Sequence, residues 1–107
     1  MSKYFKEIEY MMDIDFLDKL DEAREFAGFP WFINSAYRGP EHPLSINNPS
    51  SSHIKGLAVD IAVTDSSTRY LIIDALIHVG FNRIGIADTF IHVDDDKDKT
   101  GGVIWTY

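Results

Sequence analysis

The residues best suited to chemistry lie in one stretch, SSSHIKGLAVDIAV, at positions 50–63. Asp60 stands there between two apolar residues, in a run that otherwise reads as a buried strand. A carboxylate buried among apolar side chains is costly unless something pairs with it. Three explanations are open: a structural hydrogen bond such as a turn cap, a salt bridge with Arg38, or a metal ion.

Two histidines can share a site with this carboxylate. His53 precedes Asp60 by seven positions, and Gly56 lets the chain turn between them. His92 lies in the later segment FIHVD, which also carries Asp94. Two imidazoles and one carboxylate suffice for a catalytic zinc whose fourth position stays open to water. A lone histidine beside a strand is more often packed or solvated, so the spacing by itself leaves both interpretations open.

The alternation of side chains along a strand indicates which of these residues share a surface. In a strand over 57–63, Asp60 shares one face with two alanines, and the larger apolar residues share the other. Small neighbours leave space above the carboxylate for a ligand. In a strand over 90–94, His92 and Asp94 point to the same face. The pattern is typical of a site rather than of a core.

The rest of the sequence predicts the elements that must position these residues. Two segments have apolar residues at helical spacing, and short β-branched or aromatic runs between turn signals predict strands. The second helix is apolar nearly all round, so we expect it to be largely buried. The order of elements predicts an α+β domain with a small, mainly antiparallel sheet and flanking helices. The expected elements are a packing arm over 1–12, a helix over 15–27, a strand over 31–37, a functional or mobile loop over 38–52, a strand over 57–63, a helix from Ser66 or Ser67 to Val79, strands over 83–87 and 90–94, and an edge strand over 103–107.

The other two histidines are weaker candidates. His78 follows Asp74 by four positions on the second predicted helix, so a surface pair is expected. His42 precedes Pro43 in the long loop, where its role stays open.

Composition limits the class of protein. A length of 107 residues suits one compact core, so we expect a single domain over 1–107. The 17 acidic and 10 basic residues give a net charge of −7, which argues against a nucleic-acid or anionic-membrane partner. There is no cysteine, so a metal site must use histidine and carboxylate. No segment reads as a signal peptide or a membrane span, so we expect cytoplasmic synthesis and no membrane insertion. We also expect a monomer.

The motif S-x-H-x-x-G-x-A-x-D over 51–60, followed by a strand that carries His92, resembles the zinc D-Ala-D-Ala metallopeptidase family. That family includes D,D-carboxypeptidases, D-Ala-D-Ala dipeptidases and phage endolysins that cut peptidoglycan peptides. The segment SAYR at 35–38 is similar to the family's S-G-Y-R element, with Ala36 in place of glycine. The resemblance runs from the first helix through Asp94, and it implies the fold shared with the Hedgehog signalling domain.

The resemblance also implies roles for individual residues. Arg38 would stabilise the scissile carbonyl or the developing oxyanion, and Ser51 and Tyr37 would line the substrate site. The residues alone leave alternatives open: Arg38 as a surface arginine or a structural partner of a carboxylate, Ser51 as one more loop serine, and Tyr37 as a rim aromatic. The implied zinc ligands are His53, Asp60 and His92, with Zn²⁺ as the cofactor.

The sequence departs from the family pattern at the general base. The family usually places Glu or Asp three residues before the last histidine, and Thr89 stands at that position. Asp88, in the adjacent turn, and Asp94, on the face of His92, are the two candidate bases. Asp88 is alternatively a solvated turn residue. Asp94 is alternatively the residue that holds the His92 imidazole.

We therefore expect a zinc peptidase that acts on D-amino-acid-containing peptides of peptidoglycan, as a D,D-carboxypeptidase or an endopeptidase. A phage-type protein would reach the cell wall after release or as a virion component. The alternative is a metal-bearing binding module that has lost the general base. A non-haem iron centre is disfavoured, because its His-x-Asp precedes the distal histidine and no histidine follows Asp94.

Overall fold

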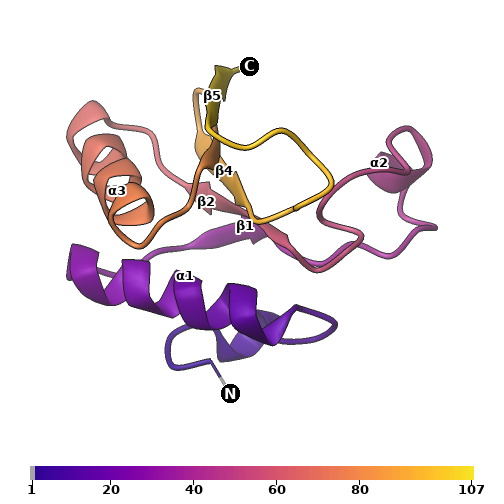
Figure 1. The fold of residues 1–107 in the computed structure, drawn as a ribbon, viewed down its shortest axis with the longest axis horizontal. Coiled ribbons are helices and arrows are strands. Elements are labelled where there is room, and N and C mark those ends of the chain that lie inside the picture. The colour runs from indigo at the N-terminus through magenta and orange to yellow at the C-terminus, as the bar shows by residue number, and fades with distance from the viewer. Residues whose placement is uncertain (1) are drawn as a thin grey trace.

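The computed structural model describes residues 2–107 and places two long helices beside a five-stranded sheet (Figure 1). The strand order is β1-β2-β4-β3-β5, with three antiparallel pairs and one parallel pair, β3 with β5. The predicted α+β class is therefore confirmed. In chain order the elements are the 3₁₀ helix η1 (Lys6–Ile8), α1 (Ile14–Ala27), β1 (Ile33–Ser35), α2 (Pro43–Ile46), β2 (Ala58–Ala62), α3 (Ser66–His78), β3 (Arg83–Ile86), β4 (Phe90–Asp94) and β5 (Val103–Thr106).

Helix α1 begins and ends where its sequence signals predict. The Asp13 side chain accepts a hydrogen bond from the Phe16 backbone N–H, which satisfies one free donor at the helix start. Gly28 ends the helix in the left-handed conformation at φ 81°, where a glycine carries no Cβ penalty. One face of the helix enters the core through Phe16, Leu17, Leu20 and Ala23.

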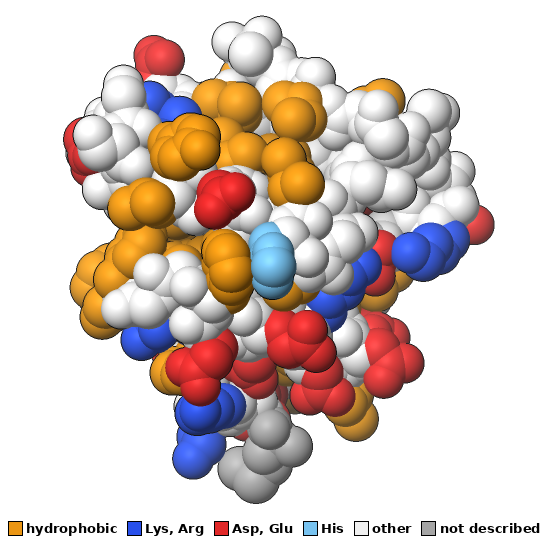
Figure 2. All heavy atoms as spheres, turned by 60° about the vertical axis from the view of Figure 1, so that its left-hand side comes forward, with side chains coloured by type: hydrophobic (Ala, Val, Ile, Leu, Met, Phe, Trp, Pro, Cys, Tyr) orange, Lys and Arg blue, Asp and Glu red, His pale blue; other side chains and the backbone are white. Residues whose placement is uncertain are grey.

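Helix α3 is less buried than its composition predicts, and this expectation was wrong. Only Ile72, Ala75 and Leu76 of this helix are buried, whereas Tyr70, Leu71 and Ile77 are exposed. The helix packs against α1 and the sheet with one side only, so the apolar residues on its other side face solvent. Hydrophobic side chains are visible on this side of the molecule in Figure 2. No helix within residues 2–107 is long and apolar enough to cross a membrane.

The sheet has a core face and an open face. Val59 and Ile61 of β2 and Ile91 and Val93 of β4 are buried and join the residues of α1 and α3 in one hydrophobic cluster. The alternate residues of the same strands point to the other face. The structure thus confirms the predicted division of strand 57–63 into one face with large apolar side chains and another face with Asp60.

Two differences from the predicted elements lie next to the site. Strand β1 covers only Ile33–Ser35, because the backbone of the following residues bonds elsewhere: the Arg38 N–H donates to the His53 carbonyl at 3.2 Å. The long loop contains the short helix α2, which the sequence analysis missed. Its cap is His42, whose Nδ1 accepts from the Leu44 N–H at 3.1 Å, and Pro43 occupies the first helical turn.

The N-terminal arm packs on the domain as predicted, apart from residue 1, which lies outside the described residues. Phe5 and Met12 are buried in the core cluster. The arm crosses the chain at Gly56, whose φ is 70° and whose carbonyl accepts from the Asp13 N–H at 3.0 Å. A Cβ at Gly56 would collide with the Met11 carbonyl oxygen, so only glycine fits.

We expect Gly56→Ala to destabilise the protein strongly. The left-handed conformation costs an alanine about 1–2 kcal/mol, and a clash with fixed backbone adds about 1–3 kcal/mol. Gly102→Ala is the matched control, because Gly102 has φ 71° but a Cβ placed there would have no neighbour within 4 Å. Urea denaturation of the two variants measures the difference. Equal losses of unfolding free energy would show that the arm yields to the added methyl group.

Candidate metal centre and active-site cavity

A single row of residues crosses the open face of the sheet and contains the candidate ligands. Asp60 of β2 pairs in register with Ser35 of β1 and with His92 of β4. His92 in turn pairs with Gly85 of β3, which pairs with Trp105 of β5. Asp60 and His92 are therefore neighbours because the register of β2 and β4 aligns them. The sequence predicted their shared face but not this register.

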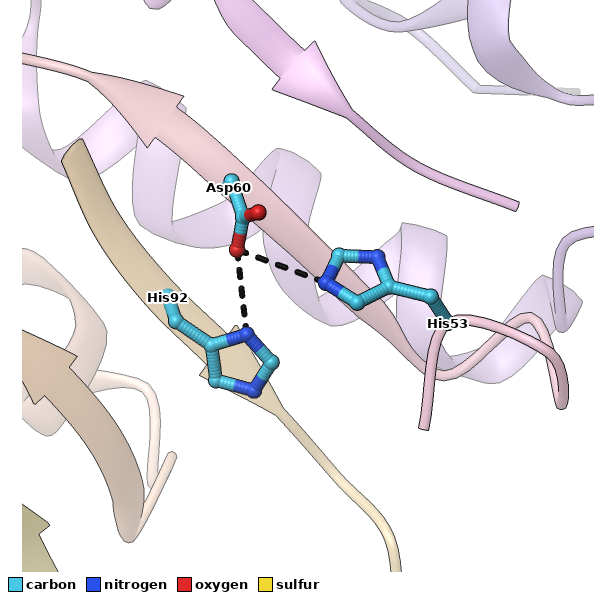
Figure 3. A group of neighbouring side chains, drawn as sticks. All are labelled: His53, Asp60 and His92. Carbon is cyan, nitrogen blue, oxygen red and sulfur yellow. Dashed lines mark hydrogen bonds and ion pairs between the residues drawn. The ribbon is translucent and has the colours of Figure 1, made fainter. Parts of the chain in front are cut away.

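His53 completes the cluster from a loop (Figure 3). It precedes the Gly56 turn and approaches Asp60 from beyond the start of β2. One oxygen of Asp60, Oδ1, lies 3.0 Å from His92 Nδ1 and 3.4 Å from His53 Nε2. The two imidazole rings meet edge to face, with centroids 5.3 Å apart. Asp60 thus faces two imidazoles rather than Arg38, and the salt bridge with Arg38, one of the three explanations left open by the sequence, is not formed among the described residues.

Each imidazole is held through its other nitrogen. His53 Nδ1 donates to the Ala36 carbonyl at 2.8 Å, because a carbonyl oxygen can only accept. His92 Nε2 lies 2.7 Å from Asp94 Oδ2, a second acceptor. In the neutral form of each ring, the nitrogen that faces Asp60 then carries a lone pair. Fixing the ring orientation and tautomer through a carbonyl or a carboxylate is how proteins prepare histidine for a metal.

The distances in this cluster fit a tetrahedral zinc site. Ligand atoms at about 2.0–2.1 Å from a tetrahedral zinc lie roughly 3.3 Å from one another. The Asp60 oxygen is 3.0 and 3.4 Å from the two ring nitrogens, and all three ligand atoms lie within 4.8 Å of one another. Three electron-pair donors that converge in this way repel one another unless a proton or a metal cation stands between them. The residues present therefore fit zinc.

The cluster shifts the pKa values of its members while no metal is bound. Burial alone would raise the pKa of Asp60, but hydrogen bonds with His53 and His92 outweigh it and lower the pKa to about 2. Burial alone would lower the pKa of His92, yet its bonds to Asp60 and Asp94 raise it. The metal-free cluster therefore favours a charged His92 between two carboxylates.

These shifts predict opposite pH dependences for the metal-free and the zinc-loaded protein. The lowered pKa of Asp60 gives stability that is present above its ordinary value of 3.8 and is lost toward about 2. The raised pKa of His92 gives stability that is complete below 6.5 and is lost as the pH rises through the folded value. Zinc needs the unprotonated ring, so the stabilisation by zinc must grow as the pH rises through that same value.

Melting temperatures with and without zinc between about pH 4 and pH 8 measure this competition. We expect the metal-free curve to fall toward neutral pH and the difference made by zinc to increase there. A zinc effect that stays constant across this range would contradict the arrangement of His92 and Asp60.

Asp94 holds the cluster through the His92 nitrogen that points away from Asp60. Its carboxylate is buried, with 1% of the residue exposed, and accepts from Arg83 Nε at 2.7 Å and from the Asp96 N–H at 3.2 Å. Burial would raise the pKa of Asp94, but the bonds with His92 and Arg83 lower it. Its two oxygens are thus already engaged. This geometry suits a residue that orients His92.

A second buried carboxylate joins the two loops that flank the cluster. Asp96 accepts from Ser52 Oγ at 2.8 Å and from Lys55 Nζ at 3.0 Å. Lys99 Nζ donates to the same Ser52 hydroxyl at 3.0 Å. Ser52 precedes His53 in the chain. This network therefore holds the loop that carries His53 in contact with the loop that follows β4.

The cluster lies in a cavity of ≈ 440 Å³, walled by the loop over 38–53 and by β2, β3, β4 and β5. Arg38 lines it, and the Arg38 Nε is buried without a hydrogen-bond partner among the described residues. Such an orphaned donor is rare in a folded protein and suits a bound ligand. Ser51 also lines the cavity, and its hydroxyl accepts from the His53 N–H at 3.3 Å.

Two of the predicted site residues are not brought to the cavity. The Tyr37 ring packs edge-on against Tyr10, with centroids 6.0 Å apart, and is not part of the cavity wall. Asp88 is exposed in the turn between β3 and β4, where its carbonyl accepts from Arg69 Nη2 at 3.1 Å. It too is not part of the cavity wall.

Several cavity residues were missed by sequence reasoning. Arg83 holds Asp94 from the adjacent strand, and Lys99, Trp105 and Tyr107 come from the segment after β4. The strand that pairs with β5 depends on how the chain crosses the sheet, so no local pattern could assign Trp105 and Tyr107 to the site. The Ala36 carbonyl was missed as well, because backbone groups carry no sequence signal.

The remaining histidine lies away from the cavity. His78 stacks on Phe26 with ring centroids 3.8 Å apart and an angle of 14°. The surface pair that we expected with Asp74 is not formed among the described residues. The nearby aromatic ring of α1 offers a larger contact than an exposed ion pair.

The sequence matches the model of a known protein family. The family model described as peptidase M15 matches residues 3–94, which include all three candidate ligands and Asp94. Neither curated proteins nor solved structures gave a match. Members of the M15 family are zinc-dependent peptidases, in agreement with the donor set of the cluster. The chain therefore belongs to the peptidase M15 family, the zinc D-Ala-D-Ala metallopeptidases.

Proposed function

We propose that this protein is a zinc metallopeptidase that hydrolyses D-amino-acid-containing peptide bonds of bacterial peptidoglycan. The observation that carries the proposal is the convergence of His53 Nε2, His92 Nδ1 and Asp60 in a cavity, with both imidazole tautomers fixed by outer acceptors. Membership of the M15 family supports the metallopeptidase chemistry. The D-amino-acid and cell-wall specificity rests on the resemblance of the 51–60 motif to the D-Ala-D-Ala peptidases.

His53, Asp60 and His92 would hold the zinc, which would supply a water of pKa about 7 and polarise the scissile carbonyl. Arg38 would place a positive charge where the carbonyl oxygen becomes negative. Asp94 and the Ala36 carbonyl keep the two imidazoles in the orientation that zinc requires. Ser51 holds the loop of His53 and stays a predicted substrate contact.

A second candidate function is a metal-bearing binding module without catalysis. One observation favours it: within residues 2–107, the cavity carboxylates are Asp60 and Asp94, and both are engaged by His92. A carboxylate free to act as general base is therefore not found in the described part of the cavity wall. The phage-type setting, with action on the wall after release or in a virion, stays a prediction in either case.

Digestion of purified peptidoglycan by the zinc-loaded protein tests the proposal. We expect mass spectrometry to show cleavage next to a D-amino acid, and none after chelation. Loss of a single terminal D-alanine would identify a carboxypeptidase, whereas release of cross-linked fragments would identify an endopeptidase. A synthetic peptide with L-alanine at the cleavage position is the matched control. Intact peptides together with bound zinc would contradict the peptidase and support the binding module.

A further inference from the structure

Strand β5 brings two aromatic side chains to the open face of the sheet. Trp105 is in register with Gly85 and thus lies in the row of Asp60 and His92. Tyr107 follows two positions later, so it points to the same face as Trp105, and its N–H donates to the Ile86 carbonyl at 3.2 Å. Both residues line the cavity and lie beyond the region matched by the family model.

Gly85 on β3 lets the Trp105 side chain lean toward the candidate ligands. A Cβ at Gly85 would lie 2.6 Å from Trp105 Nε1, so glycine leaves the space that the indole fills. The indole then comes to 5.5 Å from the His92 ring, measured between centroids. β5 lies two strand spacings, about 10 Å, from β4. Even so, the Tyr107 ring lies only 5.3 Å from the ring of Phe90 on β4.

The Tyr107 phenol is accessible, and the charged groups of the site act on its pKa. The residue is 69% exposed, so a ligand in the cavity can reach it. Partial burial raises the pKa of Tyr107, and the charges of Asp60 and Asp94 raise it further, against a hydrogen bond with Trp105 that lowers it. The phenol therefore carries its proton at neutral pH and can donate a hydrogen bond.

We propose that Tyr107 is a catalytic residue whose phenol O–H donates a hydrogen bond to the scissile carbonyl oxygen as that oxygen gains negative charge. This inference rests on the proposed peptidase function. Water adds through its oxygen to the carbonyl carbon, and the π electron pair moves onto the oxygen that Tyr107 contacts. The pair returns as the C–N bond breaks, and the leaving amine gains the proton that the water lost. Tyr107 keeps its own proton throughout.

Tyr107→Phe tests this role, because it removes one oxygen atom and keeps the ring that packs on Phe90. We expect kcat for a D-Ala-D-Ala peptide to fall about 10²-fold, with KM and zinc affinity unchanged within about twofold. The affinity for a phosphinate analogue of the tetrahedral intermediate should fall as well. Tyr70→Phe is the matched control, since Tyr70 is also 69% exposed but lies on α3, away from this cavity.

Unchanged kcat and unchanged phosphinate affinity in Tyr107→Phe would overturn the inference. A loss that is accompanied by weaker zinc binding would overturn it too, because the phenol would then support the fold of the site. If the wild-type protein cleaves no peptide, the proposed function fails. The phosphinate measurement still decides on Tyr107 in that case: tighter binding by the wild type than by Tyr107→Phe supports the contact, and equal binding refutes it.

Discussion

Asp60→Asn should abolish zinc binding at physiological concentrations and peptidase activity with it. The variant keeps the shape of the side chain but removes the negative charge that both imidazoles face. Structural zinc sites in zinc-finger peptides bind the ion with about 10–16 kcal/mol, so a single protein ligand to zinc carries several kcal/mol. We expect zinc affinity to fall by at least about 10²-fold and turnover to fall with zinc occupancy. Competition with a chromophoric chelator measures the affinity.

Asp88→Asn is the matched control for this experiment. It makes the same chemical change in the same chain, at a carboxylate that lies outside the cavity wall. We expect zinc affinity and kcat to stay at the wild-type values. A large loss of kcat in Asp88→Asn, with zinc retained, would show that the turn moves to bring a general base to the substrate.

Arg38→Met should leave zinc binding intact and reduce turnover. Arg38 lines the cavity, and its buried Nε lacks a partner among the described residues. If a substrate oxygen satisfies this donor in the transition state, its removal should lower kcat by about 10²–10³-fold with little change in KM. Arg38→Lys should recover only part of the rate, because an ammonium cannot reproduce the planar donor fork.

Arg69→Met provides the control for Arg38. Arg69 also has a buried Nε without a partner in the described structure, but its side chain contacts the Asp88 carbonyl rather than the cavity. We expect Arg69→Met to lower stability without lowering kcat. Equal losses of turnover in the two variants would mean that Arg38 acts through the fold and not on the substrate.

The parts of the site that lie on strands were predictable because strand alternation is local. The period of two placed Asp60 between two alanines and put His92 and Asp94 on one face, and the structure has both arrangements. The ends of α1 were predictable for a similar reason, since a capping aspartate and a left-handed glycine act on adjacent backbone groups. The motif at 51–60 supplied His53, which no periodicity could have assigned.

The parts that depend on long-range packing were not predictable. Tyr37 was expected at the substrate, but its ring packs on Tyr10 of the N-terminal arm. The burial of α3 was overestimated, because composition does not tell how many neighbours a helix has. The parallel pairing of β5 with β3 decides that Trp105 and Tyr107 reach the cavity. These features follow from topology, which the local sequence does not encode.

Whether His53, Asp60 and His92 hold a zinc ion is decided most directly by anomalous diffraction at the zinc absorption edge. Crystals of the zinc-loaded protein are required. We expect one strong peak about 2.0–2.2 Å from His53 Nε2, His92 Nδ1 and an Asp60 oxygen, with Asp94 still bonded to His92 Nε2. A peak at His92 Nε2 and Asp94, or zinc only at surface carboxylates, would contradict this ligand set.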